Sequence, residues 1–420
     1  MKKCYKRKGI AFFRRKEKVS ISKRNHLIRN KTMNAHERVR ASLSHQEPDR
    51  VPTISCIDVQ SHVYEILGGK PDNSYKYITN PITAKIIDFT SPVLNALNVF
   101  DRDVTEFMLK KLESDVIMGY DATWAIYANI FLFKNSKYMT DIYGGRLYKI
   151  ADDGHGNMDT PMYLDGTFQT PDDWRRFNKK RWEALPDKMF QFNTLINKKF
   201  GKDIYIFGSL FMGLFENAWQ PFGFARFARF VKKERAFLEE VIEYNKNIYL
   251  RVIDAIADAG LPGFIMSDDM AYKSGPMLNP VTTDELFGYA YREVNDHAHK
   301  KGLVTIIHTD GWTIPLLPYF VKWGFDGHHS LEPTAHVDLG EVRKVIGHKL
   351  SLLGHLDIAH VLSYGTKKEV FDHVRDSVRK AGAGGGLILG PSNSHADIKV
   401  QNIRWMMEAI DTYGRYPLSS

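Results

Sequence analysis

A chain of 420 residues, 43% hydrophobic and 25% charged, has a globular composition and is long enough to bury one large core or two smaller ones. Its two cysteines, Cys4 and Cys56, are too few for a disulfide framework or an all-cysteine metal site. Because no apolar run reaches the roughly 18 residues of a membrane span and the N-terminus lacks a secretory signal, we expect a cytoplasmic protein without a membrane partner.

The net charge of +9 is concentrated at the N-terminus. Residues 1–32 hold thirteen Lys or Arg and one acid, Glu17, a net +12 that leaves −3 for the remainder. A basic tail can bind nucleic acid or a membrane surface. It can equally be an extension without a role, or a start placed too early, since Met33 opens the first segment with domain-like character. We predict a disordered extension over 1–32 and no nucleic-acid partner.

From Met33 on, short β-branched runs ending in polar residues alternate with stretches of helical periodicity, as in repeated βα units. Eight runs are predicted as strands: 51–57, 115–120, 204–208, 263–266, 303–307, 327–329, 350–354 and 386–389. Amphipathic stretches predict helices over 232–259, 282–300, 367–381 and 400–413. Eight alternating units favour an α/β fold, a single (β/α)8 barrel over residues 33–420.

A long insertion separates the second and third predicted strands. Residues 138–199 are rich in Asp, Gly and Pro, and Tyr143-Gly144-Gly145-Arg146 is a possible hairpin turn. We interpret this insertion as a lid or an outer subdomain of the barrel.

Polar residues that follow the strands are the first candidates for function, because barrel enzymes carry their catalytic groups at the C-terminal strand ends. Acids and imidazoles dominate them: Asp58, Asp121, Glu216, Asp268, Asp269, His308, Asp310, His328, His329, Glu332, His355, Asp357, Ser392, Asn393 and His395. Clustered Asp, Glu and His bind a divalent metal or transfer protons. A lone His at a strand end is more often a hydrogen-bonded structural residue.

The segment His308-Thr309-Asp310-Gly311 is the strongest single motif, since two ionisable groups leave the strand together beside a glycine that permits a tight turn. Asp268 and Asp269 follow the preceding strand and can be ligands, bases or helix caps. Glu216 either faces a pocket or lies on a helix surface. We expect Glu216, Asp269 and His308 to point into one cleft of a few hundred Å³.

Several segments from both ends of the chain and from the strand ends form a recognisable set: Glu37-Arg38-Val39, Glu47-Pro48-Asp49-Arg50-Val51-Pro52, Ser267-Asp268-Asp269-Met270, His308-Thr309-Asp310-Gly311, Gly385 to Ser392 and Gln401-Asn402-Ile403. This set resembles the uroporphyrinogen decarboxylase superfamily, which includes the decarboxylase and cobalamin-linked methyltransferases acting on methanol, methylamine or aryl ethers. The resemblance spans about residues 33–417. It implies a (β/α)8 barrel, in agreement with the strand pattern.

The sequence departs from two patterns of that superfamily. The thiol-alkylating members have His-x-Cys with a later Cys, all binding zinc; here His308 matches, Asp310 replaces the first Cys, and Asn393 lies near the second. A thiolate-rich zinc site is therefore excluded, but His308 and Asp310 can hold a divalent metal, zinc among the candidates. The decarboxylase has an Arg-rich motif after strand one, whereas residues 56–65 contain no Arg.

Three functions remain from the resemblance. The first is methyl transfer from a small methylated substrate to a corrinoid on a partner protein, with a metal or acid polarising the leaving heteroatom. The second is decarboxylation of a porphyrinogen or another acid, with Asp58 stabilising a protonated pyrrole. The third is a non-catalytic barrel that binds a ligand or partner. An acidic mouth opposes a polycarboxylate substrate, which favours the first.

For that function the expected residues fall into two groups. The catalytic group is His308, Asp310, Asp269 and Asp58, with His308 and Asp310 as metal ligands. The residues expected to contact the substrate are Glu216, Trp219, Asp268, His329, His355 and Asn393.

Overall fold

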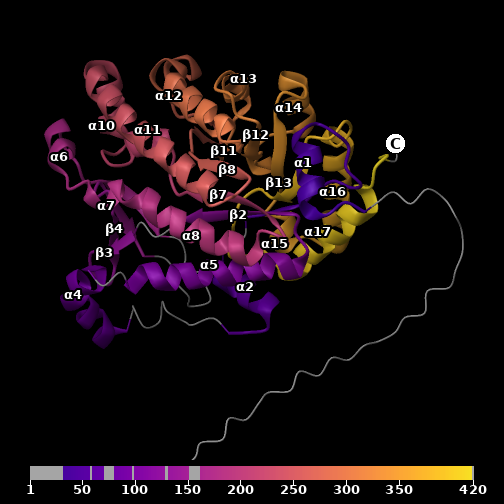
Figure 1. The fold of residues 1–420 in the computed structure, drawn as a ribbon, viewed down its shortest axis with the longest axis horizontal. Helices are drawn as coiled ribbons and strands as arrows, with labels where there is room; N and C mark the ends of the chain where they lie inside the picture. Colours follow the sequence, from indigo (N-terminus) through magenta and orange to yellow (C-terminus); the bar gives the residue numbers. More distant parts are fainter. Residues whose placement is uncertain are drawn as a thin grey trace, which may run out of the picture. The chain divides into compact units, whose positions relative to one another are not determined.

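Parallel strands form a closed ring in the computed structural model, which describes residues 32–56, 59–70, 80–96, 99–127, 131–150 and 161–418 (Figure 1). In sheet order they are β1 (Ile54–Ser55), β2 (Ala122–Tyr127), β7 (Tyr205–Leu210), β8 (Gly263–Ser267), β11 (Val304–Thr309), β12 (Gly327–Ser330), β13 (Ser351–Leu356) and β14 (Leu387–Pro391). The ring closes where the Leu389 N–H donates to the Pro52 carbonyl at 2.9 Å. The predicted (β/α)8 barrel is confirmed.

Helices cover the outer face of the barrel. The longer ones are α5 (Val99–Met118), α8 (Leu185–Phe200), α11 (Arg235–Asp258), α12 (Pro280–Lys300), α16 (Lys367–Ala381) and α17 (Val400–Tyr413). α11 packs against α8 and α12, and α16 packs against α17; Figure 1 shows α11 and α12 side by side. The four helices predicted from periodicity coincide with α11, α12, α16 and α17 within a few residues.

The alternation of side chains along each strand decides what fills the barrel. Ile265, Ile306 and Leu353 belong to one buried cluster inside the ring. Ile307, next to Ile306, belongs instead to the cluster between strands and helices. Because successive side chains point to opposite faces, His308 at the end of β11 returns to the interior.

The second predicted strand, residues 115–120, is wrong. Residues up to Met118 continue α5, and β2 begins only at Ala122. Asp115 faces inward from this helix, where it accepts hydrogen bonds from Ser55 Oγ and Thr123 Oγ1, both at 2.7 Å. Asp121 therefore precedes its strand and lies at the N-terminal end of the barrel, opposite to the end where the sequence pattern put it.

An antiparallel sheet forms the predicted insertion. Its strands are β3 (Phe131–Phe133), β4 (Tyr138–Asp141), β5 (Arg146–Lys149) and β6 (Met162–Gly166), followed by α6 (Pro171–Arg176) and α7 (Lys180–Glu183). The hairpin predicted around Gly144 is confirmed, since β4 and β5 pair antiparallel and Gly144 has φ +74°. The insertion ends earlier than predicted, because α8 packs on α11 as a barrel helix.

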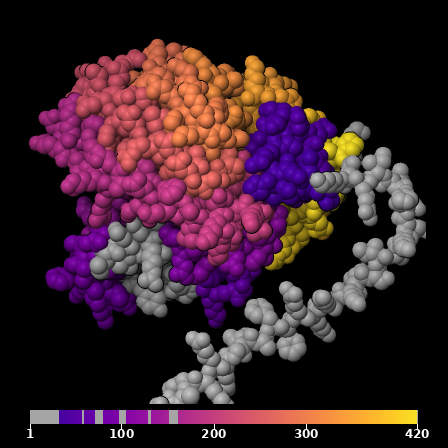
Figure 2. Space-filling model, in the orientation of Figure 1, coloured from indigo at the N-terminus to yellow at the C-terminus, as the bar shows by residue number. Residues whose placement is uncertain are grey.

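The first helix and the C-terminal segment meet beside the barrel. α1 (Ala35–Leu43) begins at a capping box in which Asn34 and Glu37 bond each other's backbone N–H. The Val51 N–H donates to Gly414 at 2.8 Å, and Figure 2 shows indigo α1 against the yellow C-terminal part. Of the predicted extension over 1–32, residues 1–31 lie outside the described residues. Among the described helices, none has the length and hydropathy needed to cross a membrane.

Candidate functional site

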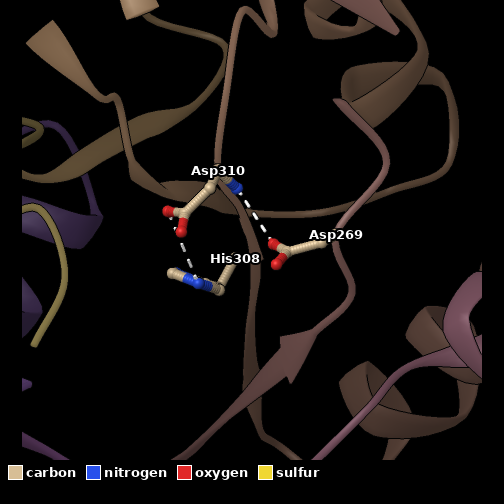
Figure 3. Close-up of side chains that lie close together, drawn as sticks. All are labelled: Asp269, His308 and Asp310. Atoms are coloured by element: carbon tan, nitrogen blue, oxygen red, sulfur yellow. Dashed lines mark hydrogen bonds and ion pairs between the residues drawn. The ribbon is translucent and has the colours of Figure 1, made fainter. Parts of the chain in front are cut away.

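Three ionisable side chains converge at the C-terminal ends of two neighbouring strands. His308 is the penultimate residue of β11, Asp310 directly follows that strand, and Asp269 follows β8 (Figure 3). The pairing of His308 with Ser267 between β11 and β8 brings the two aspartates level. One donor atom from each of the three side chains lies within 4.8 Å of the others. An imidazole and two carboxylates in this arrangement form a potential site for a divalent metal.

Asp310 is held by two neutral donors. Ser330 Oγ donates to Asp310 Oδ1 and Asn393 Nδ2 donates to Oδ2, both at 2.5 Å. Burial, together with the charge of Asp269, raises the pKa of Asp310 to about 8. Ser330 has φ +91°, a strained conformation for a residue with a side chain. Backbone strain in β12 thus accompanies the contact that orients Asp310.

His308 is an uncharged ligand candidate. Its side chain is buried, with the residue 4% exposed, and burial lowers its pKa to about 3. Its Nδ1 lies 2.7 Å from Nδ1 of His329, and its Nε2 lies 3.8 Å from Asp310 Oδ1. The ring of Trp124 packs against it at 4.6 Å between centroids. The nitrogen that faces the aspartates is therefore Nε2.

Asp269 has no Lys or Arg partner among the residues that the structure describes. Its Oδ1 accepts a hydrogen bond from the Asp310 N–H at 3.0 Å. Burial, and then the charge of Glu332, raise its pKa. Lys273 is bound to Glu332 at 3.5 Å. In the described part of the chain, neither Asp269 nor Asp310 forms an ion pair with Lys or Arg.

Asp268 serves as a helix cap, one of the roles left open by the sequence. Its two carboxylate oxygens accept the N–H groups of Phe215 and Glu216 at 2.9 Å, at the start of α9 (Leu214–Trp219). Tyr291 donates its hydroxyl to the same carboxylate at 2.6 Å. Burial raises the pKa of Asp268 to about 7. Its oxygens are thus occupied by the protein.

Glu216 lies next to Asp269 and not on a helix surface. The charge of Asp269 acts on the carboxyl group of Glu216, and Gln220 Nε2 donates to its Oε1 at 2.6 Å. Burial, followed by the charge of Asp269, raises the pKa of Glu216 well above its usual value. Asp269 therefore stands between Glu216 and the pair of His308 and Asp310.

Arg146 was not found by the sequence pattern. This buried residue begins β5 of the insertion, pairs with Asp141 at 2.5 Å, and donates to Asn217 Oδ1 at 2.6 Å and Gln220 Oε1 at 2.9 Å. It thereby docks the insertion on α9, the helix of Glu216. The neighbouring glycine turn was a visible signal, but it does not reveal which surface the arginine meets.

The remaining predicted residues have other surroundings. Trp219 packs on Tyr163 at 5.3 Å between ring centroids. His355, with φ +76°, bonds the Leu331 carbonyl through Nδ1 at 2.9 Å. His329 lies behind His308, and Asn393 supports Asp310. Asp58 lies outside the described residues.

A cavity of about 370 Å³ lies away from this cluster. It is a hollow between α8 and α11 on the outer ring, lined by residues such as Phe190, Arg251 and Asp258. None of Glu216, Asp269 and His308 lines this cavity, and the cleft that we expected around them stays a prediction.

Comparison with known proteins gives a family and a fold. The model of the uroporphyrinogen decarboxylase family matches residues 157–413. A methyltransferase from Methanosarcina mazei superposes with a TM-score of 0.63 at 16% identity, over 90% of this chain and 99% of that one, which is a likeness of fold. No curated protein sequence matches the chain.

Two sugar epimerases superpose less well. The 3-keto-D-glucoside 4-epimerase from E. coli has a TM-score of 0.39 at 12% identity, over 73% of this chain and 94% of its own. A D-psicose 3-epimerase from Clostridium cellulolyticum H10 has 0.39 at 8%, over 72% and 91%. Scores this low support no conclusion about the site.

Proposed function

Because the chain belongs to the uroporphyrinogen decarboxylase family, we propose that it transfers a methyl group from a small methylated substrate to a corrinoid carried by a partner protein. The observation that carries this proposal is the cluster of Asp269, His308 and Asp310 at the barrel mouth. Its two carboxylates have no Lys or Arg partner among the described residues. Such a mouth suits a small neutral or cationic substrate better than a polycarboxylate.

The three residues fit a divalent metal. Nε2 of neutral His308 and one oxygen from each aspartate would hold it, and a dication would offset the charges of the two half-buried carboxylates in their deprotonated form. When bound, such an ion supplies Lewis acidity at the heteroatom that carries the methyl group. Zinc and harder ions such as manganese both accept this donor set.

The protein groups have distinct tasks in this proposal. Ser330 and Asn393 keep both oxygens of Asp310 in place. The pKa of about 3 makes His308 a ligand and not a proton donor near neutral pH. We assign proton delivery to the carboxyl of Glu216, because its burial raises its pKa and so favours the protonated form. The heteroatom that loses its methyl group would take this proton, and the corrinoid of the partner would supply the methyl acceptor.

Decarboxylation of a porphyrinogen is disfavoured by the same surroundings. Carboxylates of such a substrate need cations. Among the described residues, the cations Arg146 and Lys273 are already bonded to Asp141 and Glu332.

The test is a methyl-transfer assay with the purified protein, cob(I)alamin as acceptor, and methylated amines, alcohols and aryl ethers as donors. We expect His308→Ala to lower the rate at least about a hundredfold, since an essential ligand is lost. The control is His299→Ala, which removes a histidine bonded to Asp326 at the other end of the barrel. Decarboxylation of uroporphyrinogen by a protein that ignores every methyl donor would refute the proposal.

A further inference from the structure

Two histidines from neighbouring strands share one hydrogen bond inside the barrel. His308 and His329 occupy paired positions on β11 and β12, and their Nδ1 atoms are 2.7 Å apart. Two ring nitrogens at this distance need one proton between them, so one ring donates and the other accepts. Which ring donates decides the chemistry of the remaining nitrogen on each.

We propose that His329 is a positioning residue that accepts the Nδ1 proton of His308 and thereby leaves the lone pair of His308 Nε2 free for a metal. This rests on the metal role of His308 in the proposed function. With the opposite direction of the bond, His308 would carry its proton on Nε2, facing Asp310 at 3.8 Å, and could not ligate.

The protons balance within the pair. Two neutral rings carry two protons in total. When His308 ligates through Nε2, one proton lies on its Nδ1 and is donated to His329 Nδ1, and the other lies on His329 Nε2. A proton held on His308 Nε2 before binding must leave to solvent, and His329 Nε2 takes one up.

His329 has no other polar task among the described residues. It is fully buried, and its Nε2 has no hydrogen-bond partner. Gly354 leaves room for this nitrogen, since a Cβ there would lie 3.2 Å from it. The indole of Trp124 packs against both rings, at 4.6 Å from His308 and 5.4 Å from His329. The imidazole thus makes a single polar contact, and this contact is with the metal-ligand candidate.

The neighbouring His328 provides a matched control. It is equally buried, but it points to the opposite face of β12, where its ring lies 5.1 Å from that of Phe320. Replacing either histidine by phenylalanine removes a buried imidazole from the same strand. Only the change at 329 removes the bond to His308.

The experiment measures Zn²⁺ affinity of the full-length protein by competition with a chelator. We expect His329→Phe to weaken binding about ten- to a hundredfold, as loss of a partner that orients a ligand does. His329→Asn should stay close to wild type, because its amide oxygen can take the place of the Nδ1 acceptor. His328→Phe should bind like wild type. Melting temperatures verify that each variant is folded.

A second measurement keeps this inference separate from the proposed function. In metal-free protein with ¹⁵N-labelled histidine, we expect a ring N–H resonance protected from exchange that disappears in His329→Phe and persists in His328→Phe. A wild type that shows this resonance but binds no Zn²⁺ would contradict the metal role alone. Absence of the resonance, undiminished Zn²⁺ affinity in His329→Phe, or equal losses in both phenylalanine variants would overturn the role of His329.

Discussion

The aspartates at the two ends of the barrel differ in whether a cation pairs with them. At the N-terminal end, Asp121 is 2% exposed and pairs with Arg38 at 2.5 Å and Arg50 at 2.8 Å. At the C-terminal end, Asp269 and Asp310 face each other and His308 without a Lys or Arg partner among the described residues. At the N-terminal end, which we call the compensated end, the arginines offset the charge of Asp121 and stabilise the fold. At the C-terminal end, the uncompensated end, carboxylates without a cation are expected where a ligand binds.

Several residues at the barrel mouth have a strained backbone. Met212, Ser330, Leu331 and His355 all have positive φ without being glycine, and all lie at or just after the ends of β7, β12 and β13. Such conformations persist only where surrounding contacts hold them, and they concentrate at functional sites. At the barrel mouth, both the unpaired carboxylates and the strained backbone conformations therefore destabilise the folded state.

Removing the ion pairs of Asp121 at the compensated end should have the largest effect on stability. Asp121→Ala leaves Arg38 and Arg50 without their shared buried partner, so we expect a loss of about 3 kcal/mol in the free energy of unfolding. Denaturant titration measures it. As a control, Asp411→Ala removes an exposed partner of Arg50 at 3.4 Å and should cost no more than about 1 kcal/mol. Equal effects of both changes would refute the contrast between buried and exposed partners.

Changing a carboxylate at the uncompensated end should weaken Zn²⁺ binding and leave the protein folded. Asp310→Asn keeps the shape of the side chain but removes a ligand charge, so we expect Zn²⁺ affinity to fall on the order of a hundredfold. Asp121→Asn should leave that affinity unchanged. Isothermal titration calorimetry compares the two. Similar affinities for Asp310→Asn and wild type would remove Asp310 from the metal site.

The uncompensated end should also make the metal-free protein pH-sensitive. The pKa of Asp310 rises from 3.8 to about 8 on folding, so the native state binds more protons than the unfolded state across that range. Stability must then fall as pH rises toward 8. Between pH 6.5 and 8.5 this group should cost roughly 1–2 kcal/mol. Below about pH 6.5, His308, with its lowered pKa, acts in the opposite direction.

Melting curves of metal-free wild type and Asp310→Asn at these two pH values isolate this effect. The wild type should lose more stability than the variant as pH rises. Saturating Zn²⁺ should stabilise the wild type more at pH 8.5 than at pH 6.5, because binding requires the deprotonated carboxylate. Identical pH dependence of the two metal-free proteins would show that Asp310 ionises normally.

The barrel could be predicted because its strands are short β-branched runs, each followed by an amphipathic helix. The failure at residues 115–120 has a physical reason. Val116, Ile117 and Tyr120 have strand-like composition, but they belong to or directly follow the last turn of the twenty-residue helix α5. The two ends of a strand lie at opposite ends of the barrel. Placing the strand before Asp121 instead of after it therefore put Asp121, in the prediction, at the C-terminal end of the barrel.

The site could be predicted only in part. His308 and Asp310 are only two positions apart in the sequence, and the expected position of catalytic groups at the C-terminal strand ends brings Asp269 to the same rim. The bond between His308 and His329 depends on the register between β11 and β12, which composition does not fix. The contact of Arg146 with α9 depends on how the insertion docks. Both contacts arise from tertiary packing, and no local sequence pattern predicts them.

The smallest effect is expected from removing residues 1–32, which precede the network around Asp121. The Met33 N–H donates to Asp49 Oδ2 at 3.0 Å, and its carbonyl accepts from Arg38 Nη2 at 2.7 Å, so the network around Asp121 includes residue 33 itself. A protein that begins at Met33 keeps both contacts, since a terminal ammonium group still donates to Asp49. We therefore expect its melting temperature and Zn²⁺ affinity to equal those of the full chain. Removal of residues through Asn34 serves as the control, because it also deletes the cap of α1 and should cost about 1 kcal/mol or more. A clear destabilisation of the Met33 variant would mean that residues 1–32 contribute to the fold.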